Sequence, residues 1–236
     1  MPKVSKKLSI QVITLFPEFI NSFVGSFGIV KRAVKQKLLS LKPVDLRKFG
    51  IDARQTVDGR PYGGGLGMVL RADVLFKALT KFKKSRIIML TPQGKPFTQK
   101  EAMRLSKYND LVFVCGRYEG FDERAREFVD EEFSVGDYVL MGGELPALVM
   151  SEAIMRLRPG ILGKDGSAEK ESFSENLLEY PQYTKPEVLK LGKKKMAVPK
   201  VLLSGNHQKV DEWRLQESLK RTKKRRPDLF EKNNIL

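Results

Sequence analysis

The 236-residue sequence contains little of what several common kinds of site require. It has one cysteine, Cys115, which excludes an internal disulfide. It has one histidine, His207, so a zinc site built from histidine and cysteine is effectively excluded, and a serine–histidine triad would have to use that residue. Cys115 ends an apolar run, so we expect a buried small hydrophobic side chain there and not a catalytic thiol.

Long hydrophobic runs are also missing. No stretch of 18 apolar residues occurs, so we expect no transmembrane helix and no membrane partner. The first ten residues, MPKVSKKLSI, include basic residues but no apolar segment like that of a signal peptide. We therefore expect a cytoplasmic protein.

Acidic residues are much fewer than basic ones. The chain has 44 lysines and arginines against 28 acids, a formal net charge of +16. This excess favours a polyanionic partner, most often nucleic acid, although a merely solvated basic surface is the alternative. The hydrophobic content of 41% is enough for a real core.

Three short apolar segments, each followed by a loop that contains glycine, predict strands of one sheet: Arg86–Leu90, Leu111–Cys115 and Asp137–Met141. In open α/β sheets, ligands bind at the carboxyl ends of the strands, and glycine lets a ligand approach bare backbone groups there. For one loop, capping of the strand would be explanation enough. Three such loops in succession favour a shared pocket.

Other elements are predicted from apolar spacing and from capping residues. They are a strand over Leu8–Phe16, a helix over Gly28–Leu39, a short strand at Val44–Leu46, a helix over Arg71–Phe82, a helix from the capping box Thr98–Glu101 to Tyr108, a helix over Pro146–Leu157, and a helix over Lys209–Arg221 with Val210, Trp213 and Leu219 on its buried face.

The segment Thr56–Met68 is predicted to be irregular, because it has five glycines between Gly59 and Gly67. It has neither the glycine spacing of a dinucleotide fingerprint nor the ending of a Walker A loop. It is either a flexible surface loop or a loop whose N–H groups bind phosphates or a base.

Charge is distributed unevenly along the chain. Nine acids lie between Arg117 and Glu144, which suits a small cationic ligand, although a solvated acidic face is the alternative for most of them. Near the C-terminus, Lys220–Arg226 has six cations in seven residues. These could complement a helix dipole or neutralise the phosphates of a nucleic acid.

Composition also predicts two domains. Residues 1–160 form the first, residues 161–170 a flexible linker with glycine and serine, and residues 171–236 a basic, helical second domain.

Several segments together resemble one known family. LTPQGKPF, CGRYEGFDER and SVGDYVLMGGELPA are similar to the cofactor loops of the bacterial tRNA (guanine-N1)-methyltransferases, which are knotted enzymes of the SPOUT class. RPYGGGLGM, SGNH, WRLQESLKRT and RRPDL extend the resemblance from Ile10 to about Pro227. It implies an α/β fold, with a SPOUT-type parallel sheet and a deep trefoil knot, plus a small helical C-terminal domain that binds tRNA.

The resemblance also implies an activity. The enzyme would transfer a methyl group from S-adenosyl-L-methionine to N1 of guanosine at tRNA position 37, immediately 3′ of the anticodon. It would act as a homodimer whose active sites are shared between subunits. Magnesium dependence has been proposed for the family, but we identify no metal-binding residues. Two alternatives are another knotted RNA methyltransferase with a different target nucleotide and an inactive basic RNA-binding module.

Removal of the N1 proton needs a general base, and charge developing on O6 of the base favours a nearby cation. The family has Asp-Ser-Phe where this chain has Glu171-Ser172-Phe173, so the resemblance implies that Glu171 is the base, with Glu169 and Glu175 as competing carboxylates. The supporting arginine would be Arg156.

The remaining site residues implied by the resemblance fall into two groups. The cofactor residues would be Met89, Leu90, Thr91, Pro92, Gln93, Gly94, Gly116, Arg117, Tyr118, Glu119, Val135, Gly136, Tyr138, Val139, Leu140, Gly142, Gly143 and Pro146. The tRNA-binding residues would be Gly59, Arg60, Tyr62, Gly63, Gly64, Ser172, His207, Arg225 and Arg226.

Overall fold

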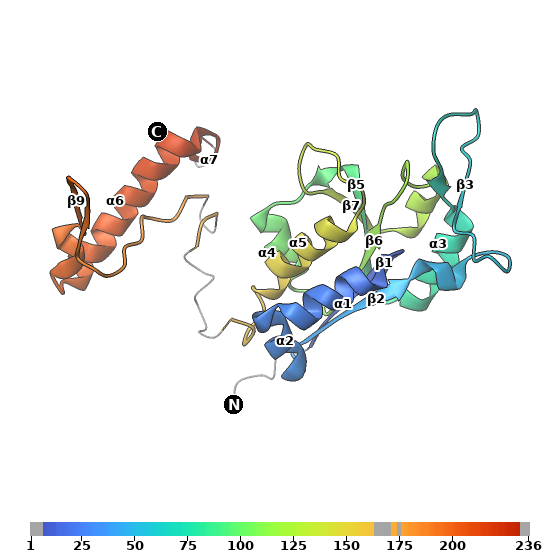
Figure 1. Ribbon diagram of the computed structural model, residues 1–236, viewed down its shortest axis with the longest axis horizontal. Helices are drawn as coiled ribbons and strands as arrows, with labels where there is room; N and C mark the ends of the chain where they lie inside the picture. Colours follow the sequence, from blue (N-terminus) through green and yellow to red (C-terminus); the bar gives the residue numbers. More distant parts are fainter. Residues whose placement is uncertain (1–6, 163–170, 174–175, 232–236) are drawn as a thin grey trace. The chain divides into compact units, whose positions relative to one another are not determined.

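A computed structural model describes residues 7–162, 171–173 and 176–231 of the chain. The chain divides into two compact units, Met1–Asp165 and Gly166–Leu236 (Figure 1). The boundary between the units falls inside the predicted linker, of which residues 163–170 lie outside the described part.

The first unit is built on a five-stranded sheet in the order β2-β1-β6-β5-β7. Every neighbouring pair in this sheet is parallel, which confirms the α/β class and the parallel sheet. The strands are β1 (Leu8–Thr14), β2 (Leu39–Asp45), β5 (Arg86–Pro96), β6 (Asp110–Cys115) and β7 (Glu131–Ser134). The central strand β6 is buried on both faces, which explains its unbroken apolar sequence.

The two faces of the sheet form two separate cores, and β6 contributes alternate residues to each. Leu111, Phe113 and Cys115 pack on the face covered by α1 (Pro17–Ser26), α2 (Gly28–Lys35), α4 (Gln99–Leu105) and α5 (Glu144–Met155). Val112 and Val114 face the other core, which α3 (Ala72–Leu79) covers (Figure 1).

Two helix predictions need correction. The helix predicted over Gly28–Leu39 ends at Lys35, because Leu39 already begins β2. The Thr98–Glu101 capping box is not formed: Thr98 is the N-cap of α4, but its side chain makes no capping hydrogen bond. The Glu101 carboxylate instead accepts a hydrogen bond from Nε of Arg104 at 2.7 Å and pairs with Lys95 at 3.4 Å.

The strand predicted over Asp137–Met141 is wrong. The strand of this region is β7, and the residues that follow it form an irregular loop in which Val139 and Met141 are about nine-tenths exposed. The apolar run of this loop suggested a buried strand. The sequence of β7 is polar because this strand lies at the edge of the sheet. Only Phe133 of β7 points into a core, and the two glutamates of the strand pair with cations.

The rest of the first unit consists of short elements. They are the 3₁₀ helices η1 (Leu46–Phe49), η2 (Thr80–Phe82) and η3 (Glu123–Phe128), and the two-residue strands β3 (Asp58–Gly59) and β4 (Val69–Leu70), which pair at the base of the glycine-rich segment.

The second unit was predicted to be helical, but it also contains a β-hairpin. Its elements are β8 (Val188–Leu191), β9 (Lys194–Ala197), η4 (Lys200–Leu203), α6 (His207–Arg225) and α7 (Pro227–Glu231). The three residues expected on the buried face of α6 are only half-buried. The buried residues of this helix are instead Ser218 and Thr222. The Ser218 hydroxyl donates a hydrogen bond to the carbonyl of Leu178, and the Thr222 hydroxyl accepts one from the N–H of Leu178, so these two bonds attach the irregular segment around Leu178 to α6.

Candidate active site

A pocket of about 330 Å³ lies at the carboxyl ends of the central strands of the first unit. Its walls are the loop within β5, the loop after β6 and the loop after β7. The glycine pattern predicted the first two loops; the third contains the predicted Gly142 and Gly143 but begins after β7 and includes residues that were expected in a strand. The lining residues are Leu90–Gln93, Gly116–Phe121, Glu123, Arg126, Phe133–Gly136, Tyr138–Gly143 and Pro146.

The structure brings together all but two of the predicted cofactor residues, Met89 and Gly94. Met89 is fully buried in the core on the α3 side, and Gly94 packs against the backbone of β7. The residues missed by the sequence reasoning are Gly120, Phe121, Glu123, Arg126, Phe133, Ser134 and Met141. Phe133 and Ser134 were missed because the strand was placed too late in the chain.

Gly143 lets the loop after β7 pass against the end of the central strand. A methyl carbon added there would lie 2.6 Å from Cα of Cys115 and 2.8 Å from N of Gly116, closer than real contacts permit. The N–H of Gly143 donates a hydrogen bond of 2.9 Å to the carbonyl of Gly116. Helix α5 begins at the next residue, so the pocket lies beside the N-terminal end of that helix.

A buried carboxylate ties the pocket loops to the end of β1. Glu144 is 2% exposed; it accepts a hydrogen bond of 2.6 Å from the hydroxyl of Thr14 and pairs with Arg117 at 2.9 Å. The Arg117 guanidinium also stacks over the ring of Phe16 at 4.2 Å and donates to the carbonyl of Met141 at 3.1 Å. Sequence reasoning placed Arg117 in the site and counted Glu144 only among the acids that suit a cationic ligand. Its contact with Thr14 was missed because the two residues lie 130 positions apart in the sequence.

Gly142 was expected to leave room for the cofactor, and the structure gives a different reason for a glycine. A methyl carbon added there would lie 2.4 Å from Nε of Arg117 and 2.7 Å from Oε2 of Glu144. The absent side chain therefore makes room for the Arg117–Glu144 pair.

Charged side chains of both signs line the pocket. Arg126 contacts Gln93 and Glu132 and pairs with Glu123 at 2.8 Å, so it joins the loop within β5 to η3 and β7. Burial raises the pKa of the Cys115 thiol well above its usual value, and the charge of Glu144 adds to this effect. A neutral, buried thiol is a poor nucleophile, in agreement with the expectation for Cys115.

The glycine-rich segment is attached to the pocket at its base. The N–H of Leu70 donates to the carbonyl of Gly120, and the N–H of Glu119 donates to the carbonyl of Met68, both at 2.9 Å. Tyr62 is almost fully exposed, and the predicted tRNA residues Gly63 and Gly64 have φ values of +82° and +83°. The predicted Gly59 and Arg60 lie at the start of the same segment, which is irregular as expected apart from Asp58 and Gly59 in β3.

The two predicted catalytic residues lie in different units. Arg156 is the C-cap residue of α5, about 18 Å along that helix from the pocket at its N-terminal end. Glu171 lies at a bend of the second unit, two residues before Phe173, whose N–H donates a hydrogen bond to the carbonyl of Leu177. Of the competing carboxylates, Glu169 and Glu175 lie outside the described residues.

The predicted tRNA residues of the second unit differ in their surroundings. Ser172 accepts a hydrogen bond from the N–H of Glu179 at 3.0 Å, and His207 is exposed at the first turn of α6. Arg225 is exposed at the end of that helix. Arg226 binds Asp228 through two hydrogen bonds, and its guanidinium lies 5.8 Å from the ring of Phe173.

Within the described residues, no group of three or more histidine, cysteine, aspartate or glutamate side chains is arranged to hold a metal ion. The same part of the chain contains no helix with the length and hydrophobicity needed to span a membrane.

Comparison with known proteins assigns this chain to a family. The family model described as tRNA (Guanine-1)-methyltransferase TrmD matches residues 8–232. A protein of Shouchella clausii named tRNA (guanine-N(1)-)-methyltransferase is 49% identical over 228 residues, 94% of this chain and 91% of the relative. Proteins of the same name from Dictyoglomus turgidum and Staphylococcus aureus are each 47% identical, covering 97% and 95% of this chain and 92% and 91% of the relatives. The chain therefore belongs to the tRNA (Guanine-1)-methyltransferase TrmD family.

Proposed function

We propose that this enzyme transfers a methyl group from S-adenosyl-L-methionine, bound in the pocket, to N1 of guanosine 37 of tRNA, immediately 3′ of the anticodon. The observation that supports this most directly is the convergence of three predicted cofactor loops on one pocket in a chain of this family. The basic second unit would contribute to tRNA binding. We place the reaction in the cytoplasm.

The residues of the pocket fit S-adenosyl-L-methionine in size and chemistry. Its volume lies in the range of pockets for small ligands. Leu90, Leu140 and Pro146 offer apolar contacts, the loop backbones offer donors and acceptors, and Glu119 and Glu123 offer negative charge to a ligand with a sulfonium and an ammonium group. When bound, this cofactor supplies an already activated methyl group, so the protein has no need to activate the donor.

The protein must act on the acceptor. N1 of guanine holds a proton that has to leave, and we assign its removal to the carboxylate of Glu171. Negative charge then develops at O6, and we assign its stabilisation to the guanidinium of Arg156. Glutamate reaches one methylene further than the aspartate of the family pattern.

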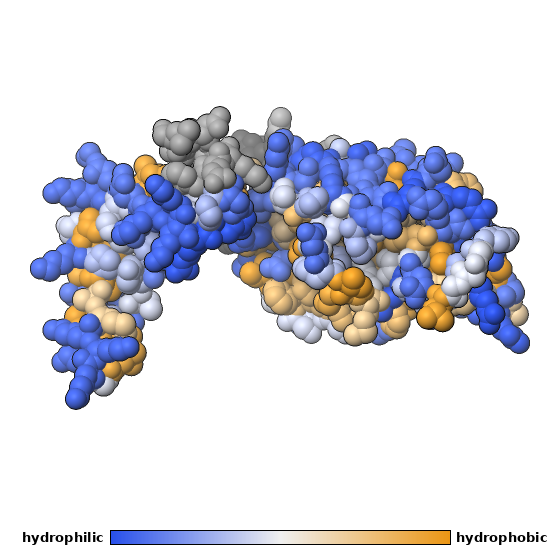
Figure 2. Space-filling view, turned by 90° about the horizontal axis from the view of Figure 1, so that it is seen from above, coloured by the Kyte–Doolittle hydropathy of each residue, from blue (hydrophilic) through white to orange (hydrophobic). Residues whose placement is uncertain are grey.

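We propose a homodimer with shared sites. Arg156 lies about 18 Å along α5 from the pocket of its own chain, so a second copy would have to supply it if it acts in that pocket. The first unit also has a concentration of hydrophobic surface on one face (Figure 2). A groove of about 450 Å³ between α1 and α5 is lined by Phe19, Phe23, Phe27, Leu145 and Val149 among others, and would be covered in such a dimer.

The trefoil knot is part of the same proposal. Its support is the tight passage of Gly143 against the end of β6, a strand that lies between two strands from earlier parts of the chain, β1 and β5. Open sheets of this kind are almost never knotted, so this feature depends on the family and not on general rules of chain topology.

Mapping of methylated nucleosides tests the activity. Pure protein is incubated with unmodified tRNA and S-adenosyl-L-methionine, and the product is located by mass spectrometry. Methylation at N1 of guanosine 37 supports the proposal, and methylation elsewhere favours a knotted enzyme with another target. A protein that binds tRNA without transferring methyl groups would be the inactive RNA-binding module.

Variants of Glu171 test the base. Glu171→Gln keeps the shape but removes the basicity, so single-turnover methyl transfer should fall by roughly two to four decades while cofactor affinity stays the same. Glu171→Asp should keep substantial activity. Near wild-type transfer by Glu171→Gln, with loss of activity in Glu169→Gln, would show that the wrong carboxylate was chosen.

Mixing two inactive variants tests the shared site. One protomer has the Glu171→Gln change and the other a disabled pocket, Gly142→Val. If each site takes its pocket from one subunit and Glu171 from the other, one site in each mixed dimer is intact, and activity should return to about a quarter of wild type. No recovery after subunit exchange would contradict shared sites.

A further inference from the structure

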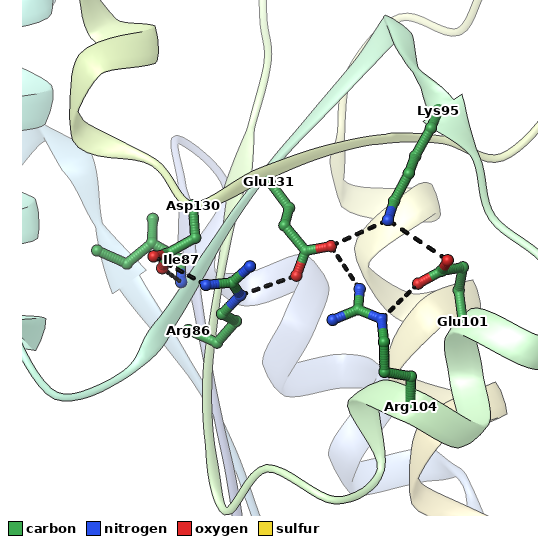
Figure 3. A network of polar contacts seen from close by, with 7 residues as sticks. All are labelled: Arg86, Ile87, Lys95, Glu101, Arg104, Asp130 and Glu131. Atoms are coloured by element: carbon green, nitrogen blue, oxygen red, sulfur yellow. Dashed lines mark hydrogen bonds and ion pairs between the residues drawn. The ribbon is translucent and has the colours of Figure 1, made fainter.

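A cluster of charged side chains lies at the edge of the sheet, outside the pocket, and Glu131 is at its centre (Figure 3). The Glu131 carboxylate accepts a hydrogen bond of 2.8 Å from Nε of Arg86, pairs with Lys95 at 3.2 Å and binds Arg104 of α4. Its side chain is only 9% exposed. The two partners from β5 come from opposite ends of that strand, Arg86 at the start and Lys95 near the finish.

The same strand forms one wall of the pocket. Pairing between β5 and β7 is interrupted: Leu90 and Lys95 both lie opposite Phe133, so the residues between them bulge out of the sheet. Thr91, Pro92 and Gln93 of this bulge line the pocket. The bulge is therefore the point where an edge strand shapes the ligand site.

The base of the bulge has little freedom to shift. A methyl carbon on Gly94 would lie 2.5 Å from N of Phe133, so the returning chain packs directly on the backbone of β7. The Lys95 ammonium lies 4.7 Å from the centre of the Phe133 ring while it pairs with Glu131 and Glu101. Lys95, which directly follows the bulge, is thus held in place by residues of β7 and α4.

We propose that Glu131 is a positioning residue for the cofactor wall: by binding Arg86 and Lys95 together, it fixes both ends of β5 and holds the Thr91–Gly94 bulge in its binding conformation. This inference rests on the proposed binding of S-adenosyl-L-methionine in the pocket. Without the cross-link, the bulge would have to be ordered when the cofactor binds, and that ordering costs affinity.

The charge state of Glu131 agrees with this role. Burial alone would raise its pKa, but hydrogen bonds from Arg104, Arg86 and Lys95 together outweigh burial and leave the pKa below its ordinary value. The carboxylate is therefore ionised at neutral pH. Neighbouring Asp130 serves as a natural comparison, because it binds Arg86 at 3.1 Å and the N–H of Ile87 at 2.7 Å but contacts only the beginning of β5.

The test compares Glu131→Gln with Asp130→Asn in the full-length protein. Calorimetry with S-adenosyl-L-methionine should show about tenfold weaker binding for Glu131→Gln and unchanged binding for Asp130→Asn. Hydrogen exchange should become faster in residues 91–97 for Glu131→Gln but not in β6. In Asp130→Asn, the change should be confined to the beginning of β5.

Lys95→Met is the second variant, because it releases only the far end of β5 and leaves Glu131 with its two arginines. It should also weaken cofactor binding and speed exchange over residues 91–97, and it decides the matter if Glu131→Gln does not fold. Unchanged affinity and exchange in either folded variant would make Glu131 a stabilising residue only. Failure of the wild type to bind the cofactor would instead refute the proposed function, while the exchange data would still report on the bulge.

Discussion

Replacement of Gly143 by alanine tests whether the loop after β7 must pass tightly against the central strand. The added methyl carbon would lie 2.6 Å from Cα of Cys115 and 2.8 Å from N of Gly116. Both are backbone atoms near the end of a buried strand, so neither can turn aside as a flexible side chain would. Relief of the clash requires separation of the loop from the strand.

The expected magnitude follows from two contributions. Overpacking of this kind costs about 1–3 kcal/mol. Separation also weakens the hydrogen bond from Gly143 to Gly116, worth about 0.5–1.5 kcal/mol. The free energy of unfolding should therefore fall by about 2–4 kcal/mol, which for a unit of this size lowers Tm by roughly 5–15 °C.

Thermal unfolding followed by circular dichroism or calorimetry measures this change, with Gly25→Ala as the matched control. Gly25 is an exposed residue of α1 with no heavy atom within 4 Å of its added methyl carbon. Alanine is the better helix former, so this control should gain about 0.5–1 kcal/mol. A Gly143→Ala protein with the Tm of the wild type would refute the close passage of the loop.

Three further predictions follow from the site and its charges. Gly142→Val should displace Arg117 from Glu144 and abolish S-adenosyl-L-methionine binding without unfolding the chain; calorimetry with unchanged affinity would argue against this. Charge reversal of Arg225 and Arg226 should weaken tRNA binding and flatten its salt dependence by about one unit of slope for each lost phosphate contact. Arg225 should contribute the larger share, because Arg226 is paired with Asp228. An unaltered slope would mean that these residues face only solvent. Because the pKa of Glu131 is lowered in the folded protein, its ion pairs stabilise the fold at pH values above the unfolded carboxyl pKa of about 4.3, and this contribution is lost as the pH falls through the lower folded pKa. The difference in unfolding free energy between wild type and Glu131→Gln should therefore shrink in acid. A difference that stays constant from pH 7 to pH 3 in denaturant titrations would contradict this.

The central part of the fold could be predicted because its sequence obeys one rule. Strand β6 lies between two other strands and is buried on both faces, so Leu111–Cys115 is unbroken apolar sequence and its assignment was correct. Strand β7 lies at the edge and has two glutamates, whose cationic partners belong to β5, α4 and η3. The partners of Glu131, Arg86 and Arg104, are distant in sequence, so local pattern could not identify β7, and the apolar loop after it was taken for the strand.

The site shows the same division. The loops that line the pocket can be recognised in the sequence by glycines next to apolar runs, and 16 of the 23 lining residues were predicted. The residues that hold these loops were not, because Glu144 meets Thr14, and Glu131 meets Arg86, only after folding. Whether Arg156 and Glu171 act together could not be derived either, since they belong to different units.

The attachment of the glycine-rich segment to the pocket loop has a thermodynamic consequence. Two backbone hydrogen bonds join residues 68–70 to residues 119–120, so a ligand that changes the conformation of one segment acts on the other. Any such effect must be equal in both directions: if an occupant of the pocket strengthens the binding of RNA to the exposed segment, RNA strengthens retention of that occupant by the same factor. Under the proposed function, cofactor binding and RNA binding would then be parts of one linked system.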